Sequence, residues 1–258
     1  MNYNYHTHTE RCHHADGTPE EYILRAAGCG IRYMGFSDHS PFICAGGEQS
    51  NYRVRSEEAR DYCGEIKNLA DKYRDRIDIK VGFEMEYYPE NFDKMLENAV
   101  SYGAEYLILG QHFLGDESIY PEPSVAPTDD IDSLRMYAEL VTAGMKTRKF
   151  TYVAHPDIFN FTGDIEVYRT QMRKICVSSV KYKIPLEINF LGIRGKRHYP
   201  DCEFLKLAGE EKAPVTFGFD AHEPYDAYDG ESLKTALGYV KRYNLNYIGK
   251  PELILLSK

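Results

Sequence analysis

Short apolar runs alternate with longer segments in which apolar residues recur at helical spacing, along almost the whole chain. The short runs are predicted strands, and they cover residues 4–9, 33–37, 77–83, 106–109, 150–154, 185–190 and 214–219. The longer segments are predicted helices, at residues 19–28, 56–76, 89–102, 131–149, 165–182 and 233–243. Because this alternation is typical of proteins with a parallel sheet, the pattern predicts an α/β fold.

Two stretches interrupt the alternation. Residues 40–55 contain Pro41, Gly46 and Gly47, and residues 115–128 contain three prolines, so both are predicted loops. The second loop is a candidate lid over a binding site. We find no linker, sequence repeat or low-complexity segment, and residues 1–258 are expected to form a single domain.

The composition narrows the class of partner. Hydrophobic residues make up 43% of the chain and charged residues 28%, as in ordinary soluble globular proteins. Since we find no membrane-length apolar run and no signal peptide, we expect a cytoplasmic protein. The formal net charge of −9 is unfavourable for binding a nucleic-acid backbone. The six cysteines include no Cys-x-x-Cys pair and are expected to be reduced.

Histidines and carboxylates lie at the ends of the predicted strands. His6 and His8 are two positions apart, so a strand would project both imidazoles from one face. Similar residues end five further strands: His39, Glu84, His112, His155, Asp220 and His222. An open sheet gathers ligands at one switch point, whereas all strands of a barrel end at one mouth. The distribution therefore favours a barrel.

Imidazoles and carboxylates that converge in this way predict a metal site. Each histidine alone could have a structural role, such as capping of a loop by His39 or a hydrogen bond from His112 to a backbone carbonyl. As a set they are better explained by metal coordination. The ligands exceed what one tetrahedral zinc ion needs, which predicts two or three divalent transition-metal ions. Zn, Mn and Fe all suit these donors.

Six short motifs at the strand ends follow one another in a fixed order. They are His6-Thr7-His8, Phe36-Ser37-Asp38-His39, Gly82-Phe83-Glu84, Gly110-Gln111-His112, Ala154-His155-Pro156-Asp157 and Phe219-Asp220-Ala221-His222. This order resembles the PHP (polymerase and histidinol phosphatase) family over essentially the whole chain, and most of all its histidinol-phosphate phosphatases. The resemblance implies a distorted (β/α)7 TIM-like barrel with a trinuclear metal site at the C-terminal face of the strands.

The resemblance also implies which residues hold each metal. The first metal would take His6, His8, Glu84 and Asp220. Glu84 would bridge to a second metal held by His112 and His155, and a third would take His39, His222 and a histidine of the loop after the first strand. The family spacing points to His14 for this last ligand, and the adjacent His13 is the alternative.

Substrate binding is also read from the resemblance. The phosphate would be held by Arg194, in a Gly-x-Arg segment, with Arg197 as a second candidate, because a guanidinium accommodates phosphate oxygens in bidentate geometry. The alternative is a solvated basic turn. Asp157 resembles a family acidic residue that would donate a proton or orient His155. Family members often carry a further arginine beside it, and residues 158–161 have none, which leaves the exact substrate open.

The expected activity is therefore metal-dependent hydrolysis of a small phosphomonoester, chiefly L-histidinol phosphate in histidine biosynthesis, with Glu84, Asp157 and Asp220 as catalytic carboxylates. The alternatives are a family phosphoesterase for another metabolite, an amidohydrolase-type metal hydrolase and a non-enzymatic metal-binding barrel. A polymerase-associated exonuclease is disfavoured by the acidic charge. The oligomeric state stays open.

Overall fold

The strands of the computed structural model, which describes residues 1–256, form two parallel sheets. The first sheet has the order β1 (Tyr3–Asn4), β2 (Tyr33–His39), β3 (Asp78–Met85) and β4 (Tyr106–Leu109). The second has the order β5 (Leu186–Asn189), β6 (Pro214–Gly218) and β7 (Asn246–Tyr247). The predicted α/β class is confirmed.

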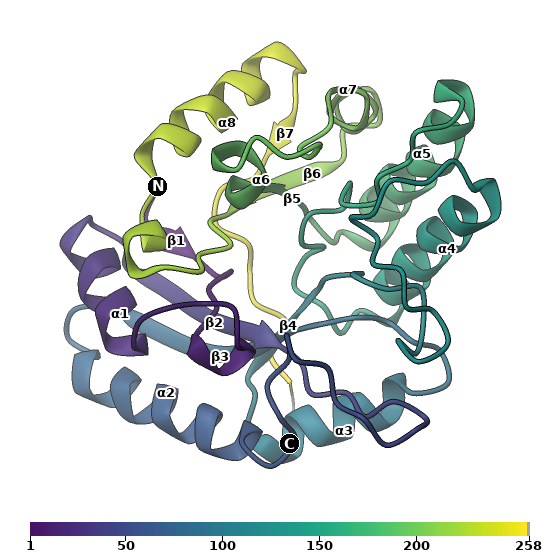
Figure 1. Ribbon diagram of the computed structural model, residues 1–258. Helices are drawn as coiled ribbons and strands as arrows, with labels where there is room; N and C mark the ends of the chain where they lie inside the picture. Colours follow the sequence, from purple (N-terminus) through teal and green to yellow (C-terminus); the bar gives the residue numbers. More distant parts are fainter. Residues whose placement is uncertain (257–258) are drawn as a thin grey trace.

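Single bridges join the two sheets on both sides. Val153 pairs in parallel with Leu109 of β4 and with Leu186 of β5. On the other side, Thr7 pairs with Ala221, just beyond β6. The strands thus form a curled parallel arrangement whose carboxyl ends point the same way, with the helices around its outside (Figure 1).

The helices follow the strands in chain order. They are α1 (Pro19–Gly28), α2 (Ala59–Tyr73), α3 (Phe92–Tyr102), α4 (Ile131–Thr147), α5 (Ile165–Tyr182), α6 (Phe190–Arg194), α7 (Cys202–Glu210) and α8 (Gly230–Arg242), with short 3-10 helices η1 (Glu10–Cys12) and η2 (Pro224–Ala227). Local sequence explains several of their ends. Thr18 and Glu21 form a capping box at α1, and the Asp164 side chain accepts hydrogen bonds from two backbone amides that begin α5.

The strands divide the core into two layers because their side chains alternate between faces. Leu107 and Leu109 of β4 belong to the large cluster that also contains the buried helix side chains. Tyr106 and Ile108, which alternate with these leucines along β4, belong to a small separate cluster. Tyr106 fits there because Gly35 lacks a side chain: a Cβ on Gly35 would lie 2.1 Å from the Tyr106 hydroxyl oxygen. This inner cluster fills the space enclosed by the strands.

Three local expectations were wrong. Residues 150–154 form no ladder, because only Val153 has the bridge geometry, although the segment hydrogen-bonds to neighbours on both sides. His6 and His8 lie beyond the short strand β1, so a continuous strand does not align them. The third error is an omission. The sequence pattern gave no sign of the helices α6 and α7 or of the strand β7, since each is short and lies among turn residues. Among the described residues, no helix is both long and apolar enough to cross a membrane.

Candidate metal centre

The centre is built where the strands end. His39 is the last residue of β2 and is the register partner of Glu84 on β3, so the two side chains emerge together. Gly110, directly after β4, leaves room for the carboxylate, because a Cβ there would lie 2.0 Å from Oε1 of Glu84. These two adjacent strands and a glycine therefore set the position of Glu84.

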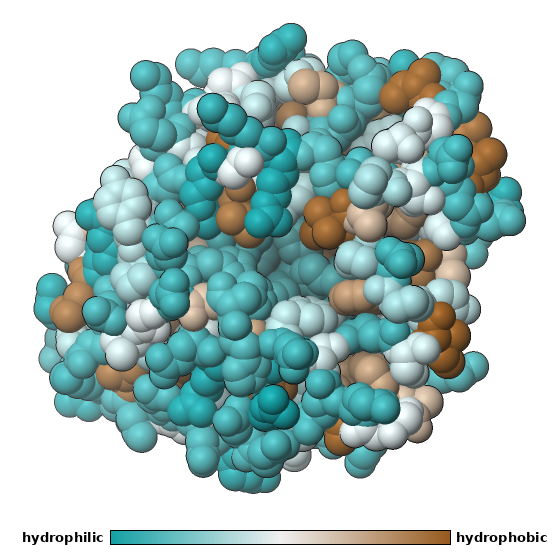
Figure 2. Space-filling model, in the orientation of Figure 1, coloured by the Kyte–Doolittle hydropathy of each residue, from teal (hydrophilic) through white to brown (hydrophobic). Residues whose placement is uncertain are grey.

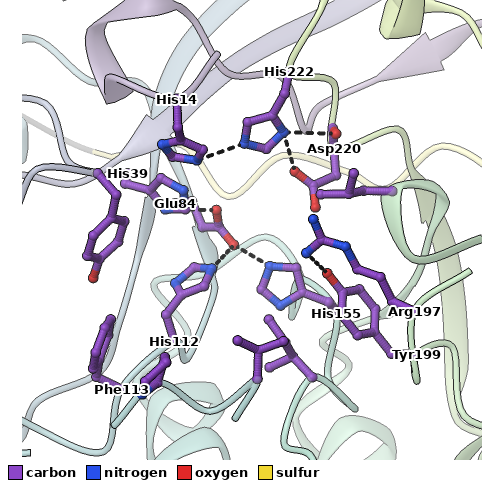
Figure 3. Close-up of a pocket in the computed structure, with 15 residues that line it drawn as sticks. His14, His39, Glu84, His112, Phe113, His155, Arg197, Tyr199, Asp220 and His222 are labelled. Carbon is purple, nitrogen blue, oxygen red and sulfur yellow. Dashed lines mark hydrogen bonds and ion pairs between the residues drawn. The ribbon is translucent and has the colours of Figure 1, made fainter. Parts of the chain in front are cut away.

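Glu84 lies among five imidazoles, and each of its oxygens faces a different group of them. Figure 3 shows three of the five, His39, His112 and His155. Oε2 lies 3.4 Å from Nε2 of His6, 3.5 Å from Nε2 of His8 and 3.2 Å from Nδ1 of His39. Oε1 lies 2.8 Å from Nε2 of His155 and 3.4 Å from Nε2 of His112. A carboxylate in this position can bridge two cations.

A second carboxylate, Asp220, approaches from the loop after β6. Its Oδ1 lies 3.3 Å from Nε2 of His8 and 3.5 Å from Nε2 of His6. His222 follows in the same loop, and its Nε2 lies 3.0 Å from Nε2 of His14. His13 instead occupies the left-handed position that ends η1, with φ of 63°, and is exposed. The structure thus turns His14, and not His13, toward the centre.

The donor atoms fit divalent ions. Among the described residues, five overlapping sets have ligand atoms within 4.8 Å of one another: His6–His8–Glu84, His6–His155–Asp220, His39–Glu84–His112, His14–His39–His222 and His8–Cys12–His222. Both ring nitrogens of His8, Nδ1 of His39 and Oε1 of Glu84 are buried without a hydrogen-bond partner. Buried polar atoms almost always have partners, so their arrangement is explained if cations bind between them.

The charges of the metal-free centre are strongly coupled. Burial alone would lower the pKa of His6, but the carboxylates of Glu187, Asp220 and Glu84 outweigh it and raise this pKa to about 10. For His39 and His222, burial and the charge of neighbouring imidazoles lower the pKa well below its ordinary value. His39 and His222 are therefore neutral near pH 7, the form in which an imidazole binds a metal.

Further carboxylates orient the imidazoles by contacting the ring nitrogens that do not face Glu84. Oε1 of Glu187 lies 2.7 Å from Nδ1 of His6, and its Oε2 accepts a 2.9 Å hydrogen bond from the backbone amide of His155. Oε1 of Glu86 lies 2.9 Å from Nδ1 of His112. Such contacts fix which ring nitrogen faces a metal. Sequence reasoning missed Glu187, although a charged residue inside an apolar strand was a usable signal.

A cavity of about 420 Å³ opens over the centre, within the size range of small-molecule sites. In the space-filling view it is the hollow near the middle of this face (Figure 2). Its apolar walls include Tyr52, from loop 40–55, and Phe113 and Val125, before and within loop 115–128. Arg197 lines the opposite side, and its Nη1 donates to the Tyr199 hydroxyl at 3.0 Å (Figure 3).

Two expected site residues do not line this cavity. The guanidinium of Arg194 donates 2.6 Å hydrogen bonds to the carbonyls of Phe219 and Asp220, and its Nε lies 2.9 Å from Asp226, so each of its three nitrogens already has a partner. Asp157 accepts from the amide of Asp201 at the start of α7, and burial raises its pKa to about 7. Asp157 lines a separate small cavity, and its expected role as proton donor or as orienter of His155 stays a prediction. For Arg194, the expected reach over the metal centre is corrected, because its guanidinium is bound to the loop after β6.

Comparison with known proteins identifies the family. The model of the PHP domain family matches residues 4–190. The chain belongs to the PHP domain family. This PHP domain is similar to a probable histidinol-phosphatase of Deinococcus radiodurans, with 27% identity over 228 residues and 85% of each chain covered. It is also similar to the histidinol-phosphatase of Bacillus subtilis, with 23% identity over 251 residues, covering 86% of this chain and 93% of the relative.

A solved structure shares the fold of this PHP domain. The crystal structure of histidinol phosphate phosphatase from Lactococcus lactis, complexed with zinc, L-histidinol and phosphate, superposes with a TM-score of 0.71. The match covers 95% of both chains at 18% sequence identity. The family resemblance seen in the six motifs is confirmed.

Proposed function

We propose that the protein is a metal-dependent phosphomonoester hydrolase that converts L-histidinol phosphate and water to L-histidinol and phosphate. The observation that carries the proposal is Glu84, with imidazoles on both of its oxygens, beneath a cavity that Arg197 lines. The relatives named histidinol-phosphatase support the choice of substrate.

The proposed ligand sets are those that the family resemblance implies. His6, His8, Glu84 and Asp220 would hold one ion, and Glu84 with His112 and His155 a second. A third would be held by His14, His39 and His222. Zinc is the first choice, since the Lactococcus lactis structure contains it, and Mn or Fe remain alternatives. The clusters His6–His8–Glu84 and His14–His39–His222 support the first and third sites, and the contacts of Oε1 of Glu84 with His112 and His155 support the second.

The bound ions would hold phosphate oxygens and lower the pKa of a water near phosphorus. Glu84 would be shared by two of these ions, and Glu187 and Glu86 hold the imidazole rings of His6 and His112 in fixed orientations. The guanidinium of Arg197 would bind the phosphate oxygens that face away from the ions. The leaving group would lie along the wall formed by Tyr52 and Phe113, where an ammonium group can contact aromatic faces.

The proposed architecture is a distorted (β/α)7 barrel formed by one domain, residues 1–258. The bridges at Val153 and between Thr7 and Ala221 support closure of the two sheets. A closed barrel explains why residues as distant as His6 and His222 converge on one mouth.

The substrate is tested with metal-analysed protein and a panel of phosphomonoesters that includes L-histidinol phosphate. We expect the highest kcat/KM for L-histidinol phosphate. A higher kcat/KM for another ester would reject this substrate but keep the reaction class. Absence of hydrolysis of every ester by the metal-loaded protein would reject the phosphatase function itself.

The phosphate contact is tested at Arg197. A charge-assisted bond contributes about 1.5–3 kcal/mol, so Arg197→Ala should reduce kcat/KM roughly ten- to a hundredfold. Arg197→Lys should recover part of this loss, since it keeps the charge without the planar fork. Metal content should not change in either variant. An unchanged kcat/KM in Arg197→Ala would mean that Arg197 does not bind the phosphate.

A further inference from the structure

Arg53, in loop 40–55, is a fully buried cation beside the site, with 1% of its surface exposed. Its Nη1 donates to Oε2 of Glu86 at 2.7 Å and to the carbonyl of Ser40 at 3.1 Å. Its Nε and Nη2 donate to Oε1 of Glu117 at 2.9 and 2.6 Å. The guanidinium therefore joins Glu86, just after the end of β3, to two loops that are separate in the sequence.

One side of this contact leads to the metal centre. Oε2 of Glu86 contacts Arg53, while Oε1 lies 2.9 Å from Nδ1 of His112. Since an ionised carboxylate only accepts, Nδ1 of His112 carries the proton, which leaves Nε2 free to face Glu84, 3.4 Å away. The position of Glu86 thus sets both the tautomer and the direction of the His112 ring.

The other side leads to the substrate cavity. Glu117 belongs to loop 115–128, and the oxygen that contacts Arg53 also accepts a 3.0 Å hydrogen bond from the Tyr52 hydroxyl. The Tyr52 ring is stacked with Phe113, with centroids 5.7 Å apart, and both line the cavity. The guanidinium carbon of Arg53 lies 4.8 Å from the Tyr52 ring centroid. Arg53 and Glu117 thus fix this aromatic wall.

Stability alone gives little reason to bury these charges. Desolvation of an ion pair offsets most of its Coulomb attraction, and apolar side chains of similar volume often stabilise a fold at least as well. Removing the cation alone would leave the buried carboxylates of Glu86 and Glu117 without compensation. The arrangement is better explained by what it holds in place.

We infer that Arg53 is a positioning residue for the proposed reaction: through Glu86 it aims His112 at the metal centre, and through Glu117 it holds Tyr52 against the leaving group. The inference rests on the proposed function. The guanidinium thus has two effects, one on the metal centre and one on the substrate cavity. Single substitutions of Glu86 and of Glu117 test the two effects separately.

The test compares Arg53→Met and Arg53→Lys with Glu86→Gln, Glu117→Gln and a control, Arg173→Met. Arg173, on α5, also forms ion pairs with two glutamates, Glu210 and Glu211, but it does not line the cavity. For each variant one measures folding by circular dichroism, the rate of zinc loss to a chelator, and KM and kcat for L-histidinol phosphate.

We expect Arg53→Met to lose zinc at least about tenfold faster than wild type and to raise KM, because residues behind metal ligands typically change metal affinity ten- to a hundredfold. Glu86→Gln should mainly accelerate zinc loss, and Glu117→Gln should mainly raise KM. Arg53→Lys should lie between wild type and Arg53→Met, and Arg173→Met should match wild type in both readouts.

Folded Arg53→Met with unchanged zinc loss and unchanged KM would overturn the inference. If Arg53→Met does not fold, Arg53→Lys and the two glutamine variants test the inference in its place. A wild-type rate of zinc loss in Glu86→Gln, together with a wild-type KM in Glu117→Gln, would also overturn the inference. If wild-type protein binds zinc but hydrolyses no phosphomonoester, the proposed function fails instead. The zinc-loss comparison then still decides whether Arg53 acts on the metal centre.

Discussion

At the scale of single residues, Glu84 holds the centre together, because it is the carboxylate nearest to imidazoles from four separate segments of chain. Its side chain has no exposed surface. An ionised carboxylate in such a position is stable only among positive charges, whether these are protons on the imidazoles or bound cations. Accordingly, the neighbouring imidazoles overcome burial and hold the pKa of Glu84 well below its ordinary value.

Replacing Glu84 by Gln removes this charge and keeps the shape of the side chain. We expect loss of at least one bound metal ion and a fall in kcat of several orders of magnitude, while the circular dichroism spectrum is retained because the core clusters lie elsewhere. Metal content and kcat of Glu84→Gln, with exposed Glu166→Gln as control, check this. Wild-type metal content and turnover in Glu84→Gln would exclude a bridging role.

The adjacent pair His13 and His14 gives a matched comparison. His14→Ala should lower the metal content by up to one ion per chain and reduce activity, because Nε2 of His14 faces His222. His13→Ala should retain both, since His13 belongs to none of the donor clusters and only ends η1. Elemental analysis of the two purified variants distinguishes them. The opposite result would place the loop ligand one residue earlier.

The sequence predicted well which residues at the strand ends come together. It predicted poorly the direction in which individual side chains point. The nine expected metal-binding side chains do converge, because the carboxyl ends of parallel strands share one mouth. Arg194 and Arg197 are three positions apart, and the sequence alone does not show which of the two side chains faces the cavity. That choice depends on α6, a five-residue helix that the pattern did not reveal.

At the scale of elements, α6 is joined to the loop after β6 by Arg194. The guanidinium donates hydrogen bonds to the carbonyls of Phe219 and Asp220. The backbone of Asp220 has a positive φ of 47°, a conformation that is unfavourable for residues other than glycine. The chain therefore uses Arg194 to stabilise the turn that presents Asp220 and His222. Fold prediction from sequence stopped short of this contact because it joins residues about 25 positions apart.

Arg194→Ala should therefore differ in kind from Arg197→Ala. We expect faster zinc loss and a free energy of unfolding lower by about 1–3 kcal/mol, with the KM for L-histidinol phosphate nearly unchanged. Chelator kinetics, urea unfolding and steady-state kinetics on both variants provide the comparison. A large rise in KM with wild-type zinc retention in Arg194→Ala would return Arg194 to the phosphate site.

At the scale of the whole molecule, the two sheets meet where the metal-binding segments meet. The amide of His8 donates to the carbonyl of Ala221 at 2.9 Å, and the amide of Ala221 donates to the carbonyl of His6 at 3.3 Å. Both segments carry expected ligands. We call this contact between residues 6–8 and Ala221 the seam between the two sheets. The sequence pattern predicted parallel strands but not the seam, because a single bridge produces no periodic signal.

Metal removal should loosen this seam first. A ligand present at a thousand times its Kd stabilises a fold by about 4 kcal/mol, so chelation should lower Tm, and added zinc should restore it. Hydrogen exchange should accelerate at the amides of His8 and Ala221 more than within the long β2–β3 ladder. Equal acceleration in both regions, or an unchanged Tm, would show that metals do not join the sheets.

The sequence separation of the ligands also has a consequence during synthesis. His6 and His8 leave the ribosome more than two hundred residues before Asp220 and His222. Until then the nascent chain offers only partial sets of donors, each weaker than the complete centre. High-affinity metal capture therefore follows the synthesis of both segments and their meeting in the folded chain.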